Sequence, residues 1–310
     1  MISHSLKLTL TFLTVIIIWS FTPLAIKWSA GDAPLVSLLI RILIGVFCCM
    51  GLLALTKTKI SLGFQERRLY LVCGISIYLP MSLIYLASQH IPSGWIAVVF
   101  GLSPLITGVF SLLVEPEDRL TASRTLGLLL GIAGLYLVFS ASLSFEESSI
   151  KGMALVLSAV TISSASSVLI RYLAKNMSIQ GMQTTIGGLL VAIPCFAITA
   201  WVNHTSGDSG FAILSFDNFL SSFGQREWIS IVFLGVIGTG VGFSLYYYLL
   251  KEVSANRVSL ITLITPITAL AVGSWFNNEP LVPQVWIGAA LVCTGLLLYE
   301  FKPKFGMRKL

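Results

Sequence analysis

Apolar residues follow one another in long runs along almost the whole chain, and short polar segments separate the runs. A run of about 20 apolar residues is long enough to cross a bilayer as a helix. The runs are continuous rather than alternating, which favours helices over a closed barrel. The pattern therefore predicts an all-α membrane protein with ten transmembrane helices. The spans are expected at about 8–28, 34–56, 69–88, 93–114, 121–142, 152–174, 181–202, 228–250, 257–276 and 281–301.

The charged residues agree with this class and suggest an orientation. The 310 residues are 56% hydrophobic and 10% charged, whereas soluble domains carry about 25% charged residues. With the N-terminus inside, fifteen of the 19 lysines and arginines fall in inside segments, three fall outside and Arg41 lies within a span. The positive-inside rule then predicts a multi-pass membrane protein with both termini cytoplasmic. The basic segment 302–310 is interpreted as a cytoplasmic tail that anchors the topology. No nucleic-acid partner is expected, despite the net charge of +6.

The second half of the chain repeats the first. Residues 85–110 align with residues 247–272, so that Pro104 faces Pro266. After a gap of one residue, two further pairs match; these are Gly127 with Gly288, and Gly134 with Gly295.

The repeat predicts two units of five helices, at 8–142 and 151–301. Because five is an odd number, the second unit enters the membrane from the opposite side. Many secondary transporters use such inverted repeats, whose halves exchange conformations around one central site. The alternative is that duplication only builds a stable bundle.

The same residues resemble a known family. The second half carries the resemblance through Phe233-Leu234-Gly235, Tyr246-Tyr247-Tyr248-Leu249-Leu250-Lys251, Val253-Ser254-Ala255-Asn256, Thr265-Pro266, Asn278-Glu279-Pro280-Leu281, Gly288 and Gly295. The first half fits less tightly, through Trp19-Ser20-Phe21, Lys27, Arg41, Pro104 and Gly127. Both halves resemble the EamA domain, the ten-helix branch of the drug/metabolite transporter superfamily. The resemblance implies two inverted five-helix EamA repeats.

The resemblance also implies a function. Members export or exchange small metabolites, often amino acids, across the inner membrane, and their cavity is lined mainly by helices 1, 3, 4, 6, 8 and 9. One departure concerns the acidic residue before the fifth helix of each unit. The family usually has Glu there, and this chain has Asp118 in the first copy and Glu279 in the second. A plainer role for both is negative charge near a helix N-terminus.

Aromatic and hydroxyl side chains within the expected spans are the first candidates for substrate binding. Aromatic faces can hold a cationic or aromatic substrate, although Trp and Tyr also collect at membrane interfaces. Threonines at every third position share one helix face and could line a polar path, whereas small residues also serve tight helix packing. The candidates are Trp19, Tyr78, Ser103, Tyr246, Thr262 and Thr265.

Pro104 and Pro266 are candidates for gating or kinking, because each lacks an N–H and pushes away the carbonyl four residues earlier. In lipid, the freed carbonyls of Phe100 and Thr262 need a partner, so they should face protein or a wet cavity. The alternative is a packing kink in which Ser103 or Thr262 satisfies the freed carbonyl.

Arg41 is the sharpest candidate, because ionisable residues inside spans are functional hypotheses by default. It lies about 10 Å into the second helix, at 1.5 Å per residue. Lys27 ends the first helix on the same outer side. The two cations together could meet a substrate carboxylate or phosphate. The alternative is that both side chains snorkel to the outer interface.

No Asp or Glu falls in the middle of any expected span. Proton-coupled carriers usually need such a group, so facilitated exit or exchange is favoured. No nucleophile with a base and no metal-ligand cluster is evident, so neither an enzyme, a cofactor nor a metal is expected. The sequence predicts a metabolite carrier that works by alternating access, with a small-molecule substrate and the lipid bilayer as partners, as a monomer or homodimer. The rivals are a lipid or sugar-lipid flippase and a non-transporting membrane sensor or assembly factor.

Overall fold

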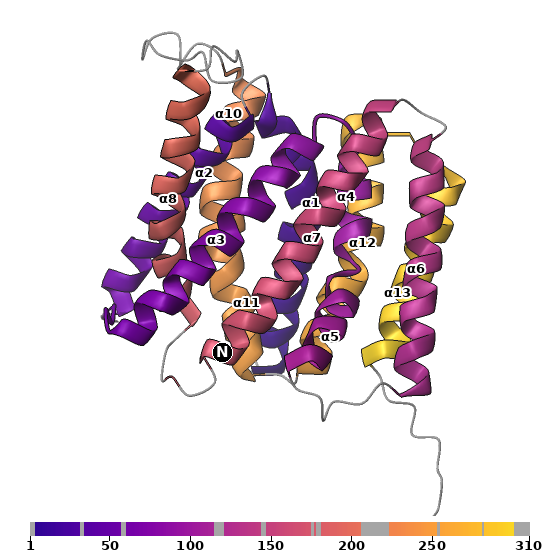
Figure 1. Ribbon diagram of the computed structural model, residues 1–310, viewed down its shortest axis with the longest axis horizontal. Helices are drawn as coiled ribbons and strands as arrows, with labels where there is room; N and C mark the ends of the chain where they lie inside the picture. The colour runs from indigo at the N-terminus through magenta and orange to yellow at the C-terminus, as the bar shows by residue number, and fades with distance from the viewer. Residues whose placement is uncertain are drawn as a thin grey trace, which may run out of the picture.

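The computed structural model is a bundle of roughly parallel helices that run between two ends of the molecule (Figure 1). It describes residues 4–31, 34–56, 60–114, 121–143, 147–174, 177, 181–205, 223–252, 255–280 and 282–300. Within these residues all regular structure is helical. The all-α class predicted from the sequence is therefore confirmed. Asp118 and the basic tail 302–310 lie outside the described residues.

The helices follow the apolar runs. Those of the first half are α1 (His4–Ala30), α2 (Pro34–Thr56), α3 (Phe64–Ala87), α4 (Ser93–Phe100), α5 (Ser103–Val114) and α6 (Ala122–Leu143). Those of the second half are α7 (Glu147–Ala174), α8 (Gly181–Thr205), α10 (Gln225–Val232), the π-helix η2 (Phe233–Val241), α11 (Gly242–Glu252), α12 (Ala255–Asn277) and α13 (Pro283–Glu300).

Seven helical segments in the described part are long and apolar enough to cross a membrane. One of these segments, Ser93–Val114, combines α4 and α5. Two further apolar segments, Ile261–Asn277 of α12 and Pro283–Tyr299 of α13, are shorter. The eighth predicted span, at 228–250, coincides with α10, η2 and α11, which follow one another without a gap.

The first helices of the two halves, α1 and α7, run in opposite directions. Lys27, near the end of α1, reaches the backbone oxygens of Ser88 and Ile91 between α3 and α4. At the same place, the hydroxyl of Ser149 at the start of α7 donates to the backbone oxygen of His90, at 3.5 Å. Thus α7 begins at the end of the bundle where α1 finishes. The start of α1 and the end of α13 both lie at the other end, the lower one in Figure 1.

Helices α6 and α13 pack backbone against backbone through four glycines. A Cβ on Gly127 would lie 2.5 Å from the carbonyl oxygen of Gly295, and one on Gly295 would lie 2.5 Å from that of Gly127. The second contact joins Gly134 and Gly288, with corresponding distances of 2.6 and 2.7 Å. Residue numbers rise along one helix as they fall along the other, so the two helices are antiparallel. The contacts are also crosswise with respect to the repeat, because each glycine touches the counterpart of its neighbour rather than its own.

The largest buried apolar cluster joins both halves. It includes Leu38 and Trp95 from the first half, and Val156, Leu234 and Ala289 from the second. Helix η2 packs on α2 through small residues, since a Cβ on Gly240 would lie 2.3 Å from Cys48 Sγ. Its wider turns fit i→i+5 bonding, and the backbone N–H of Gly242 at its end accordingly donates to Ile237 O, five residues earlier. Such π segments recur at functional sites.

Candidate functional site

An aromatic pair lies between α1 and α11. The rings of Trp19 and Tyr246 are 5.0 Å apart, centroid to centroid, and tilted by 41°. Trp19 lies near the middle of α1, and both side chains are half-buried against a small cluster that includes Val15 and Ile261. Tilted aromatic pairs at this spacing attract each other. The structure therefore brings together two residues that the sequence selected independently.

Hydroxyl side chains of α12 lie close to this aromatic pair, next to Ser20 of α1. Ser20, next to Trp19, lies 2.5 Å from the Oγ1 of Thr268. Thr265 Oγ1 donates to the backbone oxygen of Ile261 at 2.7 Å. Thr262 is half-buried on the same helix. Thr262, Thr265 and Thr268 recur at every third position of α12, which is why the sequence drew attention to them. Ser20 belongs to no such repeated spacing.

Tyr78 belongs to a different group. Its hydroxyl forms a hydrogen bond with Thr199, and its ring packs edge-on against Phe196 at 4.9 Å. Both partners are on α8. Tyr78 is therefore paired across the α3–α8 interface rather than with Trp19 and Tyr246.

The two repeat-matched prolines differ in setting. Pro266 is inside α12. Pro104 instead stands in the first turn of α5, just after the helix interruption at residues 101–102 between α4 and α5. The expected kinked helix at Pro104 is therefore a break into two helices, because proline is readily accommodated in a first helical turn. Gly101 lies at this break, and a Cβ there would be 3.0 Å from Cγ of Pro266. The two matched regions thus meet inside the bundle.

Ser103, beside the same break, contacts α7. Its Oγ lies 3.4 Å from Ser164 Oγ, and Ser164 Oγ also lies 3.2 Å from the backbone oxygen of Ser103. Ser103 therefore links α5 to α7 and has no contact with the aromatic pair in the described residues.

Arg41 is buried between helices of the first half, with 6% of its surface exposed. Its Nη1 donates to the hydroxyl of Tyr85 on α3, at a long 3.5 Å, and its guanidinium lies 5.9 Å from that ring's centroid. Ser29 on α1 lies 3.3 Å from the same hydroxyl. The Arg41 side chain is therefore covered by protein rather than extended along the outer surface of the bundle.

Lys27 is not part of this group. Its ammonium donates to the backbone oxygens of Ser88, at 3.0 Å, and of Ile91, at 2.8 Å. These carbonyls follow the end of α3, where a cation is favoured by the helix dipole. Lys27 and Arg41 therefore do not form the pair that the sequence suggested. Lys27 binds the backbone carbonyls after α3, and Arg41 contacts Tyr85.

Glu279 connects the two halves at the same end. Its carboxylate accepts from the backbone N–H of Ser93 at 3.0 Å, from the Ser93 hydroxyl at 3.0 Å and from the backbone N–H of Gly94 at 3.2 Å. Asn277 donates to it as well, at 3.1 Å. The sequence indicated a carboxylate near a helix N-terminus, and the helix proves to be α4 of the other half rather than α13, which follows Glu279 in the chain.

His90 lies between the spans at this end, and its titration gives a testable pH dependence. Burial lowers its pKa below the ordinary value of 6.5, and the positive charges of Lys151 and Lys27 lower it further. The folded protein then binds fewer protons at His90 than the unfolded chain does. This contribution to stability is complete above about pH 6.5 and is lost as the pH falls below it.

Thermal unfolding in detergent at about pH 7.5 and about pH 5.5 measures this contribution. We expect the midpoint to fall more for the wild-type protein than for His90→Gln, which has no imidazole to protonate. Equal falls would show that His90 has no such coupling.

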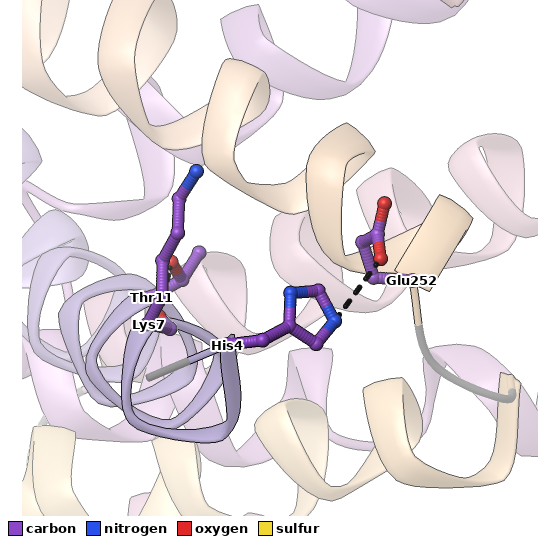
Figure 2. Close-up of polar contacts among 4 residues, drawn as sticks. All are labelled: His4, Lys7, Thr11 and Glu252. Atoms are coloured by element: carbon purple, nitrogen blue, oxygen red, sulfur yellow. Dashed lines mark hydrogen bonds and ion pairs between the residues drawn. The ribbon is translucent and has the colours of Figure 1, made fainter. Parts of the chain in front are cut away.

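The opposite end carries a weaker polar contact between α1 and α11, drawn in Figure 2. His4 Nε2 lies 3.5 Å from Glu252 Oε2, and 68% of the His4 side chain is exposed. The ammonium of Lys7, one turn along, lies 5.1 Å from the ring centroid of Tyr248. Exposed ion pairs contribute about 0–1 kcal/mol, so this contact joins the two helices only loosely.

An apolar groove of about 400 Å³ lies between α5 and α7. Its lining is Phe110, Leu113, Val114, Ala165, Val168, Leu169 and Tyr172. It is near the C-terminal ends of both helices, whereas Lys27 and Arg41 lie near the end where α7 begins. The roughly 20 residues between these levels of α7 correspond to about 30 Å.

The chain matches the EamA-like transporter family over residues 6–140 and 150–301. It is 24% identical to the "Uncharacterized transporter YoaV" of Bacillus subtilis (strain 168), over 98% of this chain and 99% of that protein. It is 22% identical to the "Probable amino-acid metabolite efflux pump" of Escherichia coli (strain K12), over 93% of each. A solved crystal structure superposes with a TM-score of 0.63 at 20% identity, covering 96% of both chains, and shows the same fold.

Proposed function

Because the chain belongs to the EamA-like transporter family, we propose that it carries a small metabolite, an amino acid or related compound, by alternating access. In this proposal it exports or exchanges that metabolite across the cell inner membrane. The relative from Escherichia coli named as an amino-acid metabolite efflux pump supports this choice of substrate class. Both termini would be cytoplasmic, with ten membrane-spanning helices between them, as a monomer or homodimer.

The observation that carries the proposal is the crosswise packing of α6 and α13. In a two-fold interface, residue i contacts residue j of the partner, and j contacts i. The repeat pairs Gly127 with Gly288 and Gly134 with Gly295. Replacing each glycine of the Gly127–Gly295 contact by its repeat counterpart gives Gly288–Gly134, which is the second observed contact. Since the helices are antiparallel, these contacts support a pseudo-two-fold axis in the membrane plane. Such an axis would relate the proposed inverted repeats, the units 8–142 and 151–301.

The substrate site would lie where α1, α11 and α12 meet. Trp19 and Tyr246 supply aromatic faces, and Thr262 and Thr265 bring hydroxyls on α12. Tyr78 and Ser103 would contribute from α3 and α5 as the halves rearrange. The contact of Gly101 with Pro266, close to Pro104, is suited to gating because it lies where the matched regions of the two halves touch.

Metabolite profiling of the medium tests this function. Cells that express the protein should release at least one compound that cells without it retain. Trp19→Ala should reduce that release by about tenfold, since loss of one aromatic contact costs about 0.5–1.5 kcal/mol beyond area burial. Trp275→Ala is the matched control, because that indole is 79% exposed on the outer surface of α12. A profile independent of the protein would refute the proposal, and equal loss in both variants would remove Trp19 from the site.

A flippase would need a lateral opening close to Lys27 and Arg41, where these cations could meet a phosphate headgroup. The groove between α5 and α7 is lateral, but it lies at the opposite end of the bundle from these cations. Lys27 also donates to two backbone carbonyls inside the bundle, which uses two of its three N–H donors. The carrier is therefore favoured over the flippase. The sensor remains an alternative that the profiling experiment distinguishes.

A further inference from the structure

Arg41 carries a buried positive charge that its described surroundings do not neutralise. Its one hydrogen bond to a described residue is the long one to Tyr85. Its Nε is buried and has no acceptor, and the described residues provide no carboxylate partner. Arginine keeps its charge in proteins, and a buried charge without a counter-charge is strongly unfavourable. An anion bound at this place would remove the penalty.

A second unpartnered polar group lies beside Arg41. Ser37 is one turn earlier on α2, and residues four apart share a helix face. Its side chain is 0% exposed, and its Oγ has no hydrogen-bond partner. Tyr85 and Ser29, also 0% exposed, complete a polar group drawn from three helices. Buried polar groups are normally hydrogen-bonded, so two unused groups on one face indicate a ligand.

The charge available here is one unit. Lys27, the other cation of this end, is occupied by the carbonyls of Ser88 and Ile91. A dianion such as a phosphate monoester would leave one negative charge uncompensated. A carboxylate carries a single charge, and its two oxygens match the planar fork of a guanidinium.

We propose that Ser37, Arg41 and Tyr85 bind the carboxylate group of the transported molecule, at the end of the bundle where α1 finishes. The proposal rests on the proposed carrier function and adds the chemical class of the substrate. The guanidinium supplies charge and two parallel donors, the serine hydroxyl supplies a third donor, and the tyrosine holds the guanidinium through its ring and hydroxyl. The amino or aromatic part of the substrate is not specified by this site.

The first test is binding of formate, the smallest carboxylate, to the purified full-length protein in detergent. We expect sodium formate to raise the midpoint of thermal unfolding by about 2–4 °C over sodium chloride at equal ionic strength. Neutral formamide should give no rise. Arg41→Gln should abolish the shift, and Ser37→Ala should reduce it. An equal effect of chloride, or an equal formate shift in Arg41→Gln, would overturn the proposal in favour of a free inorganic anion or of no site.

Ser37→Ala keeps the test meaningful if Arg41→Gln folds poorly. Its hydroxyl has no bond to lose in the empty site, so the variant should fold like the wild-type protein. It should nevertheless bind formate about fivefold more weakly, because one hydrogen-bond donor to the anion is missing. Unchanged formate affinity in a well-folded Ser37→Ala would contradict the assignment.

The second test separates a substrate carboxylate from a free anion. Compounds released into the medium only by cells with the wild-type protein should carry a free carboxylate. Arg41→Gln should lower their release about tenfold or more, the expected loss for a charge-assisted bond. Release of a neutral compound or a phosphodiester, or equal release by Arg41→Gln, overturns the carboxylate site and leaves the carrier function standing. No protein-dependent release at all overturns both.

Discussion

Gly127→Ala is expected to destabilise the folded bundle by about 1–3 kcal/mol, although alanine is the better helix former. The added Cβ would lie 2.5 Å from the carbonyl oxygen of Gly295 and 3.1 Å from the backbone nitrogen of Tyr299. Both neighbours are backbone atoms and cannot turn aside as a flexible side chain can. Relief requires α6 and α13 to separate, which weakens the contact at Gly134 and Gly288 as well. Equilibrium unfolding of the purified protein in mixed micelles measures the loss.

Gly51→Ala is the matched control for this prediction. Gly51 is within α2, and a Cβ there would meet nothing within 4 Å. The substitution should therefore be neutral or stabilising by about 0.5–1 kcal/mol, the usual gain of alanine over glycine in a helix. If Gly127→Ala behaved like Gly51→Ala, the close packing of α6 on α13 would not exist in the membrane. The argument for a two-fold relation between the halves would then lose its basis.

Glu279→Ala is expected to cost about 2–4 kcal/mol of stability, because it removes the acceptor of two buried N–H groups of α4 and of the Ser93 hydroxyl. Each buried donor left without a partner costs about 1–3 kcal/mol. The negative charge of the carboxylate is also stabilising at the N-terminal, positive end of the α4 dipole. Glu279→Gln retains one acceptor oxygen and should lose about half as much. The same unfolding experiment provides the values.

Glu66→Ala provides the comparison for Glu279. Glu66 also lies in the first turn of a helix, α3, but its contact with the Ser61 hydroxyl is exposed. Its loss should cost less than about 1 kcal/mol. Similar costs for the two substitutions would mean that Glu279 acts only through the general helix dipole. The link between the two halves at this end would then be unimportant for stability.

Much of the fold follows from information that is local in the sequence. The free energy of placing a segment in a bilayer depends on its own residues, so runs of apolar residues predict helices well. The all-helical class was correct for this reason. The break before Pro104 was not predicted, although Gly101 stands before Pro104 where Leu263 holds the matching position before Pro266. The structure adds that Gly101 lies close to Pro266, a contact between distant parts of the chain.

The candidate site was less accessible to sequence reasoning. Trp19 and Tyr246 were selected separately, and their contact depends on how α1 and α11 are rotated about their axes. Tyr78 had the same sequence features, yet its ring faces α8. Ser37 was overlooked because a serine inside an apolar run is common. Its spacing of four residues from Arg41 was the available signal.

The sequence by itself determined the solvent of this protein, its helical class and the resemblance between its halves, because hydropathy and repetition are properties of a linear chain. The tertiary structure alone decided that Lys27 and Arg41 have separate partners, and that Glu279 serves a helix of the other half. The physical reason is that a helix can rotate about its axis without changing its hydropathy. Its rotation is set by packing against helices that are distant in the sequence.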